Sequence, residues 1–131
     1  MAGLEGAASL IRMLGDENED VRHRAATCVG WLGHEPLSAQ LLPLLADTSA
    51  SVRRAAIEAL GNLKSLNVVA DVIDLLDDPE ESVQRTASHV LQTITGKQMV
   101  KAFPEDENER QILVARWRAW QREEKPLFRE S

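Results

Sequence analysis

The chain has 131 residues, a length that fits one ordinary domain. Its formal net charge of −6 argues against non-specific binding to nucleic acid or to an anionic membrane, because both need a basic surface. Hydrophobic residues make up 44% of the chain but aromatic residues only 4%, so the core must be aliphatic, which favours helices over a β-sandwich. The single cysteine excludes a disulfide framework and is consistent with a reducing, cytoplasmic location, and no apolar run has the length of a membrane span.

A repeat of 31 residues runs through the first 95 positions without a gap. Its clearest columns are Asp16, Asp47 and Asp78; Val21, Val52 and Val83; Ala25, Ala56 and Ala87; Leu14, Leu45 and Leu76. Within each copy the apolar residues follow one another at steps of three and four, which is typical of an amphipathic helix. Each copy is therefore predicted to be a helix pair, with first helices at 6–15, 37–46 and 67–77 and second helices at 21–33, 52–64 and 83–95.

Polar residues and one proline mark the predicted helix starts. Asp20, Ser51 and Ser82 precede the valine column and are predicted to cap the second helices. Pro36 suits a helix start, where its missing N–H costs nothing, and Asn67 in the equivalent column suits a cap. Because such short pairs cannot bury their apolar faces alone, the copies at about 5–34, 36–65 and 67–95 are predicted to stack as a right-handed α-solenoid.

The string from Val52 to Gly61 after Asp47, and Val21-Arg22 after Asp16, resemble short HEAT-like repeats of the phycobilisome-lyase type. The resemblance covers about residues 6–95. In that family the loop aspartate and the arginine after the valine form a ladder of hydrogen bonds and ion pairs between neighbouring repeats. The resemblance implies a ladder of Asp16, Arg22, Asp47, Arg53 and Asp78, with a weaker last rung at Gln84, where a neutral amide replaces the arginine.

The last quarter of the chain, residues 96–131, departs from the repeat. Gly96 is predicted to end a helix, and Phe103-Pro104 marks a turn. A helix is predicted at 105–124 with acidic residues in its first turn, followed by a loose tail at 125–131. Its apolar stripe is Ile112, Leu113, Ala115 or Arg116, Trp117 and Trp120. The helix is expected to cap the solenoid, with the alternative that Trp117 and Trp120 anchor a partner.

The sequence offers no clear seat for catalysis or for a cofactor. Deoxyhypusine hydroxylases, which are also HEAT-repeat proteins, carry recurring His-Glu pairs for two irons, but here the equivalent column starts His23-Arg24, Arg54-Ala55 and Arg85-Thr86. The one His-Glu dipeptide, His34-Glu35, is predicted to lie in a loop, and a single pair cannot assemble a metal centre. Cys28 shares its column with apolar residues and is predicted to belong to the core. We therefore expect no metal, no cofactor and no enzymatic activity.

The remaining candidate is the surface of the second helices, which line the concave side of HEAT-like stacks. Residues opposite the buried stripe form columns there, and the partner-binding candidates are His23, Thr27, Trp31, Arg54, Glu58, Arg85 and His89. A basic row on an acidic chain suits an acidic peptide, although ordinary solvated charges explain it equally well. Trp31 is the unusual member, since its column equivalents are polar; it is either an exposed binding residue or packed against the loop at Pro36.

We therefore expect a non-enzymatic HEAT-like module that binds a protein or peptide through its concave face. Three repeats give a shallow groove, which suits a small adaptor or a module of a longer chain. The alternative implied by the resemblance is an accessory subunit or domain related to bilin lyases, which would need an apolar cleft for a tetrapyrrole. DNA binding of the kind seen in HEAT-like alkylpurine glycosylases is disfavoured, because it needs a broad basic face.

Overall fold

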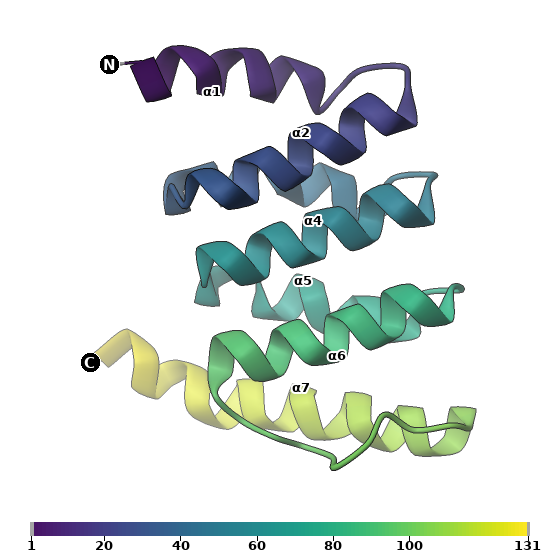
Figure 1. The fold of residues 1–131 in the computed structure, drawn as a ribbon. Helices are drawn as coiled ribbons and strands as arrows, with labels where there is room; N and C mark the ends of the chain where they lie inside the picture. Colours follow the sequence, from purple (N-terminus) through teal and green to yellow (C-terminus); the bar gives the residue numbers. More distant parts are fainter. Residues whose placement is uncertain (1, 131) are drawn as a thin grey trace.

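The computed structural model describes residues 2–130, with side chains described for residues 7–123. Every regular element in that range is helical. Three long helices, α2 (Glu19–Leu32), α4 (Ala50–Leu63) and α6 (Glu81–Thr95), lie side by side as one layer, with shorter helical segments behind them (Figure 1). Helix α1 (Ala2–Met13) pairs with α2 at one end of the stack, and α7 (Glu107–Glu130) lies at the other end. The chain is thus an α-solenoid, as the repeat predicts.

The second and third of the predicted first helices are broken into shorter pieces. The segment before α4 consists of η1 (Glu35–Leu37), α3 (Ser38–Leu41) and η2 (Leu42–Ala46). Before α6 the order is η3 (Leu66–Val68), α5 (Val69–Asp74) and η4 (Leu75–Asp77). In the earlier segment Pro43 removes a backbone donor and crowds the preceding turn, so one continuous helix over 37–46 cannot form. Pro36 does lie in the first turn of a helical segment, η1, as predicted.

The second helices begin two residues earlier than predicted, and their caps move accordingly. The N-cap residues are Asn18, Ser49 and Glu80, whereas the predicted caps Asp20, Ser51 and Ser82 lie inside the first turns. The cause is the loop aspartate of each pair: a carboxylate oxygen of Asp16, Asp47 or Asp78 accepts the N–H of the residue two positions later and turns the chain early. Asn67 is not a cap either, because it lies within η3, which begins after Ser65.

The ends of the second helices have left-handed backbone. Gly33 ends α2 with φ 67° and Gly96 ends α6 with φ 74°, and the second of these confirms the predicted helix stop. Lys64 occupies the same place after α4 with φ 53°, and it is the one described non-glycine residue with positive φ. A side chain with a Cβ is strained in this conformation, so glycine would fit the position better.

Small residues set the closest approach between the long helices. A Cβ built on Gly30 of α2 would lie 2.8 Å from the Ala59 Cα of α4, and one on Gly61 would lie 3.1 Å from a Val90 methyl group of α6. The interior around these contacts is aliphatic, and Val52, Leu60 and many other core side chains have no solvent exposure. Close packing of Ala, Gly and Val therefore explains why the stack needs so few aromatic residues.

Helix α7 covers the α5 side of the stack. It starts two residues later than predicted and continues to Glu130, so helix replaces most of the predicted tail, of which Ser131 lies outside the described residues. Leu113, Val114 and Trp117 are buried. The predicted stripe is wrong at Ile112, which is 54% exposed, and at Ala115 and Arg116, which are also exposed, because Val114 takes the inward position instead. None of the described helices is both long and apolar enough to cross a membrane.

Candidate functional site

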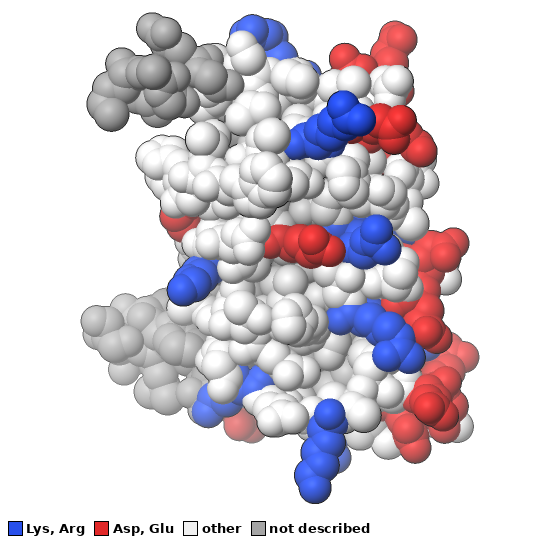
Figure 2. Space-filling view, in the orientation of Figure 1, with Lys and Arg blue, Asp and Glu red and all other residues white. Residues whose placement is uncertain are grey.

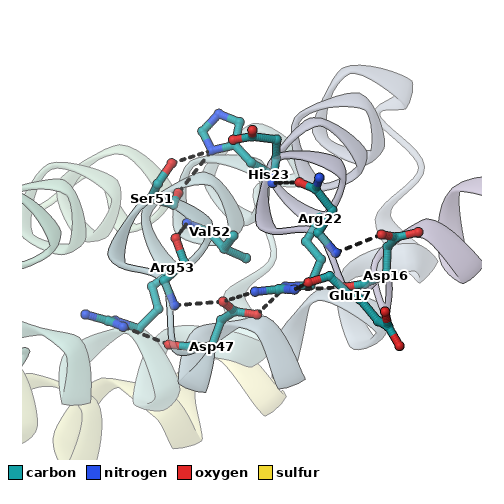
Figure 3. A network of polar contacts seen from close by, with 11 residues as sticks. Asp16, Glu17, Arg22, His23, Asp47, Ser51, Val52 and Arg53 are labelled. Carbon is teal, nitrogen blue, oxygen red and sulfur yellow. Dashed lines mark hydrogen bonds and ion pairs between the residues drawn. The ribbon is translucent and has the colours of Figure 1, made fainter.

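Arginine and aspartate side chains link successive helix pairs at the edge where α2, α4 and α6 begin (Figure 3). Arg22 of α2 donates from Nε to Asp47 Oδ1 at 2.8 Å and from Nη2 to Asp47 Oδ2 at 3.1 Å. Arg53 of α4 repeats the arrangement on Asp78, at 2.8 Å and 3.0 Å. The third nitrogen of each arginine, Nη1, donates to backbone oxygens of its own pair, including the Asp47 carbonyl at 2.7 Å from Arg53. Each arginine therefore ties its own loop to that of the next pair.

The two ends of this ladder differ from its middle. Gln84 donates from Nε2 to the Asp78 carbonyl at 2.6 Å, which reproduces the backbone bond of the arginines but carries no charge. At the other end, within the described side chains, no arginine reaches the Asp16 carboxylate, which accepts the Asn18 N–H at 2.8 Å. The ladder implied by the resemblance thus has two ion-paired rungs, and Asp16 joins it through its carbonyl, which accepts from Arg22 at 2.8 Å.

The charges of the ladder shift the acid–base behaviour of the first ion pair. Burial on its own would raise the pKa of Asp47. The hydrogen bonds from Arg22 and from the Ser49 N–H lower the pKa by more than burial raises it, so the net shift is downward. The hydrogen bond to Asp47 raises the pKa of Arg22. Both shifts favour the charged pair. We assign the ladder a structural role, because the guanidinium groups of Arg22 and Arg53 are already engaged by the neighbouring carboxylates and by backbone carbonyls.

The predicted binding residues lie on the surface of the three long helices that is here called the α2–α4–α6 face. They are His23, Thr27, Trp31, Arg54, Glu58, Arg85 and His89. His23 lies at the junction of α2 and α4, with Nδ1 2.8 Å from Ser51 Oγ. Thr27 is half-buried and donates its hydroxyl to the His23 carbonyl at 3.1 Å. These two side chains are engaged within the protein, and they support the face rather than project from it.

Three other predicted residues line one hollow between α4 and α6. Glu58, Arg85 and His89 border a cavity of about 450 Å³ together with Asn62, Thr86 and Thr93, and Gly61 and Val90 complete it. Arg54 lies next to this group, with Nε 4.0 Å from Glu58 Oε1. The contact of Gly61 with Val90 brings α4 and α6 close together here, so the hollow is shallow and lined mostly by polar side chains.

Trp31 stands apart from the hollow near the end of α2. Its side chain is 77% exposed, and the neighbouring Leu32 is 46% exposed. It is therefore not packed against the loop at Pro36, which decides between the two interpretations that the sequence leaves open. In Figure 2 the part of the face where the long helices end is largely uncharged, whereas acidic side chains gather at the edge where they begin. Trp117, in contrast, is fully buried and packs edge-on against Trp120 at 5.7 Å between ring centroids, so it cannot anchor a partner.

Sequence reasoning missed the contribution of the segment between α6 and α7. The guanidinium carbon of Arg85, Cζ, lies over the ring of Phe103, 5.1 Å from the ring centroid. With Lys101 it helps to enclose a second hollow of about 190 Å³ beside α6, which Arg85, Ser88, His89 and Gln92 also line. Residues 97–106 have no periodic pattern, so nothing in the sequence indicates that they fold back onto α6.

The described histidine, cysteine and acidic side chains do not form a metal-binding cluster. Among the described side chains, no three His, Cys, Asp or Glu residues lie where they could hold one metal ion. Cys28 is partly exposed, whereas its column equivalents Ala59 and Val90 are buried. The prediction of a core position for Cys28 therefore holds only in part.

The fold and the ladder define the chain as a helical-repeat module. A sequence profile of HEAT repeats matches residues 38–119, which is more than half of the chain, and the chain belongs to the HEAT repeat family. The match extends into α7, beyond the predicted repeats, and does not single out the phycobilisome-lyase type. No curated protein matches the chain significantly. HEAT repeats generally mediate protein–protein interactions, and their family is typically one of non-enzymatic scaffolds.

Proposed function

We propose that this protein binds an extended segment of a partner protein across the α2–α4–α6 face, with Trp31 as the apolar anchor. The observation that carries the proposal is the 77% exposure of the Trp31 side chain on this face. A tryptophan side chain buries about 150–250 Å², and at about 25 cal/mol per Å² the 77% of Trp31 that is exposed is worth roughly 3–5 kcal/mol when a partner covers it. Tryptophan is also among the residues most enriched at interface positions of this energy.

The spacing of the helices sets the length of the segment. Packed helices lie about 8–10 Å apart, so Trp31 on α2 and Arg85 on α6 are separated by two such steps, roughly 16–20 Å, across the stack. Trp31 lies near the end of α2 and Arg85 near the start of α6, which adds about 12 Å along the helix axes and makes the separation about 20–23 Å. An extended chain advances about 3.3 Å per residue, so about six or seven residues span this distance. In the proposed complex the segment runs across the three helices, with one side chain on Trp31 and others in the hollow lined by Glu58, Arg85 and His89.

The remaining predicted residues have supporting parts in this proposal. Arg54 and Glu58 place one positive and one negative charge in the middle of the face, which favours a segment of mixed polarity. His23 links α2 to α4 through Ser51, and Thr27 donates to the His23 carbonyl within α2. Six of the eight residues that line the hollow between α4 and α6 have polar side chains, which does not favour the bilin-lyase alternative, because a tetrapyrrole needs an apolar cleft.

The test is a peptide-display selection on the full chain, followed by affinity measurements on the enriched peptides. Trp31→Ser should weaken binding by at least 30-fold, as expected for a loss of about 2 kcal/mol. The matched control is Ile112→Ser, since Ile112 is also a large exposed apolar side chain, 54% exposed, but lies on α7. Both variants should melt at the wild-type temperature. If enriched peptides bind the Trp31 variant and the wild type equally, the proposal is wrong.

A further inference from the structure

The smaller hollow beside α6 has an unusual lining. Its polar side chains, Arg85, Ser88, His89, Gln92 and Lys101, can all donate hydrogen bonds, and two of them carry a fixed positive charge. Among the described residues that line it, none is acidic. The larger neighbouring hollow, in contrast, includes the carboxylate of Glu58, which would repel an anion. The chain as a whole has a net charge of −6, so this hollow is a local region of the opposite, positive charge.

Arg85 is held in place at this hollow by two contacts. Its Nε donates to Glu81 Oε2 at 3.0 Å, and its guanidinium plane lies over the ring of Phe103. Within the described residues, Nε is the only nitrogen of this guanidinium that makes a hydrogen bond, so Nη1 and Nη2 remain for a ligand. The Glu81 side chain is 68% exposed, and solvent therefore screens much of its charge. A guanidinium fixed in this way loses little conformational freedom on binding an anion.

The size and the position of the hollow select the ligand. A volume of about 190 Å³ accommodates a carboxylate on a short side chain but not a large ring system. Arg85 and His89 line both this hollow and the larger one, so the two are adjacent. A segment that crosses the α2–α4–α6 face can therefore place one side chain beyond α6 and into the smaller hollow.

We infer that this hollow is a carboxylate site, which receives the side chain of an aspartate or glutamate in the bound partner segment. Arg85 and Lys101 supply the charge, and His89 and Gln92 supply further hydrogen-bonding groups. The inference rests on the proposed function, because it assigns to the segment anchored on Trp31 an acidic residue about six or seven positions away.

The test titrates the ¹⁵N-labelled full chain with N-acetyl-glutamate N-methylamide, which presents a side-chain carboxylate between two neutral ends. The amide resonances of residues 85–92 and 100–103 should shift in a saturable way. The glutamine analogue, which has the same shape but replaces one charged carboxylate oxygen by a neutral NH2 donor, should bind at least tenfold more weakly. N-acetylglycine and inorganic phosphate represent a chain-end carboxylate and a phosphate. Preferential binding of either at the same resonances would overturn the assignment to an acidic side chain.

Single substitutions then locate the site. Arg85→Gln and Lys101→Gln should each weaken binding of the glutamate analogue by about tenfold, as expected for the loss of one charge-assisted hydrogen bond. Lys97→Gln removes the same charge from the same segment but outside the hollow, and it should bind like the wild type. Equal binding by Lys97→Gln and Lys101→Gln variants, or by the glutamate and glutamine analogues, would refute the inference. Trp31→Ser should leave this small ligand unaffected, so failure here is distinct from failure of the proposed function.

Discussion

Removal of the Asp78 carboxylate is expected to be among the most destabilising single changes at the edge of the stack. The carboxylate accepts two hydrogen bonds from Arg53 and one from the Glu80 N–H, and it is only 3% exposed. Asp78→Ala breaks all three and leaves a guanidinium that is 12% exposed without its counter-charge. Breaking a buried ion pair by removing one partner costs about 3–5 kcal/mol, and residual solvent access to Arg53 places this case near 3 kcal/mol.

Asp16 provides the control for this prediction within the same chain. Asp16 occupies the same repeat position as Asp78. Its carboxylate accepts the Asn18 N–H just as that of Asp78 accepts the Glu80 N–H, but among the described side chains no arginine bonds to it. Asp16→Ala therefore removes the loop contribution alone, about 1 kcal/mol. The difference of about 2 kcal/mol between the two variants measures the ion pair that joins neighbouring helix pairs.

The assay is urea and thermal unfolding, followed by circular dichroism at 222 nm and by tryptophan fluorescence. The two probes are needed because stacked repeats can unfold from one end, and Trp31 and Trp117 lie in different parts of the stack. For a chain of this size a loss of 3 kcal/mol lowers the Tm by about 10 °C. Equal losses for Asp16→Ala and Asp78→Ala, within 0.5 kcal/mol, would show that the ion pair contributes nothing beyond the loop.

Three further changes probe other features of the stack. Gly30→Ala places a Cβ 2.8 Å from the Ala59 backbone and should lower the free energy of unfolding by about 1–2 kcal/mol, although alanine has the better helix propensity. Gly15→Ala is the control, because its Cβ would lie 3.7 Å from the nearest atom. It should change the free energy of unfolding by less than about 0.5 kcal/mol in the same urea titrations. Lys64→Gly relieves the positive φ of 53° and should raise the free energy of unfolding by about 0.5–1 kcal/mol, and a lower Tm would contradict this reading. Because the folded-state pKa of Asp47 is lowered, its charge stabilises the fold above about pH 4, and this stabilisation is lost as the pH falls through the folded pKa. The stability difference between wild type and Asp47→Asn should therefore be constant above about pH 5 and shrink toward pH 3, whereas a difference independent of pH would exclude this linkage.

The parts of the fold that follow from local pattern could be predicted from the sequence. The columns through Val52 and Ala56 locate the second helices, because a 31-residue period forces equivalent residues into equivalent environments. The caps could not be placed correctly, since which short polar residue ends a loop depends on the hydrogen bonds of Asp47 and its equivalents. The inward position of Val114 in place of Ile112 likewise depends on how α7 rotates against α5, and the sequence contains no information on that packing.

The same distinction, between positions within the repeat and positions outside it, applies to the candidate site. The exposure of Trp31 is consistent with its polar column equivalents Asn62 and Thr93, which indicate a solvent-facing column. The placement of Phe103 and Lys101 beside Arg85 could not be foreseen, because it depends on a non-periodic segment that returns across α6. Contacts made by such segments are specific to the tertiary fold and leave no trace in a repeat pattern.

The direction of α7 has a consequence for assembly. Arg110 of α7 lies 3.6 Å from Asp77, and Arg118 farther along lies 2.9 Å from Asp74, so α7 runs antiparallel to α5. Successive first helices of a regular stack run parallel to one another. A head-to-tail contact that repeats the internal stacking would generate an open-ended filament, because nothing limits the number of copies. The reversed helix has the opposite polarity, so the surface at this end of the stack does not reproduce the internal contact between successive helix pairs.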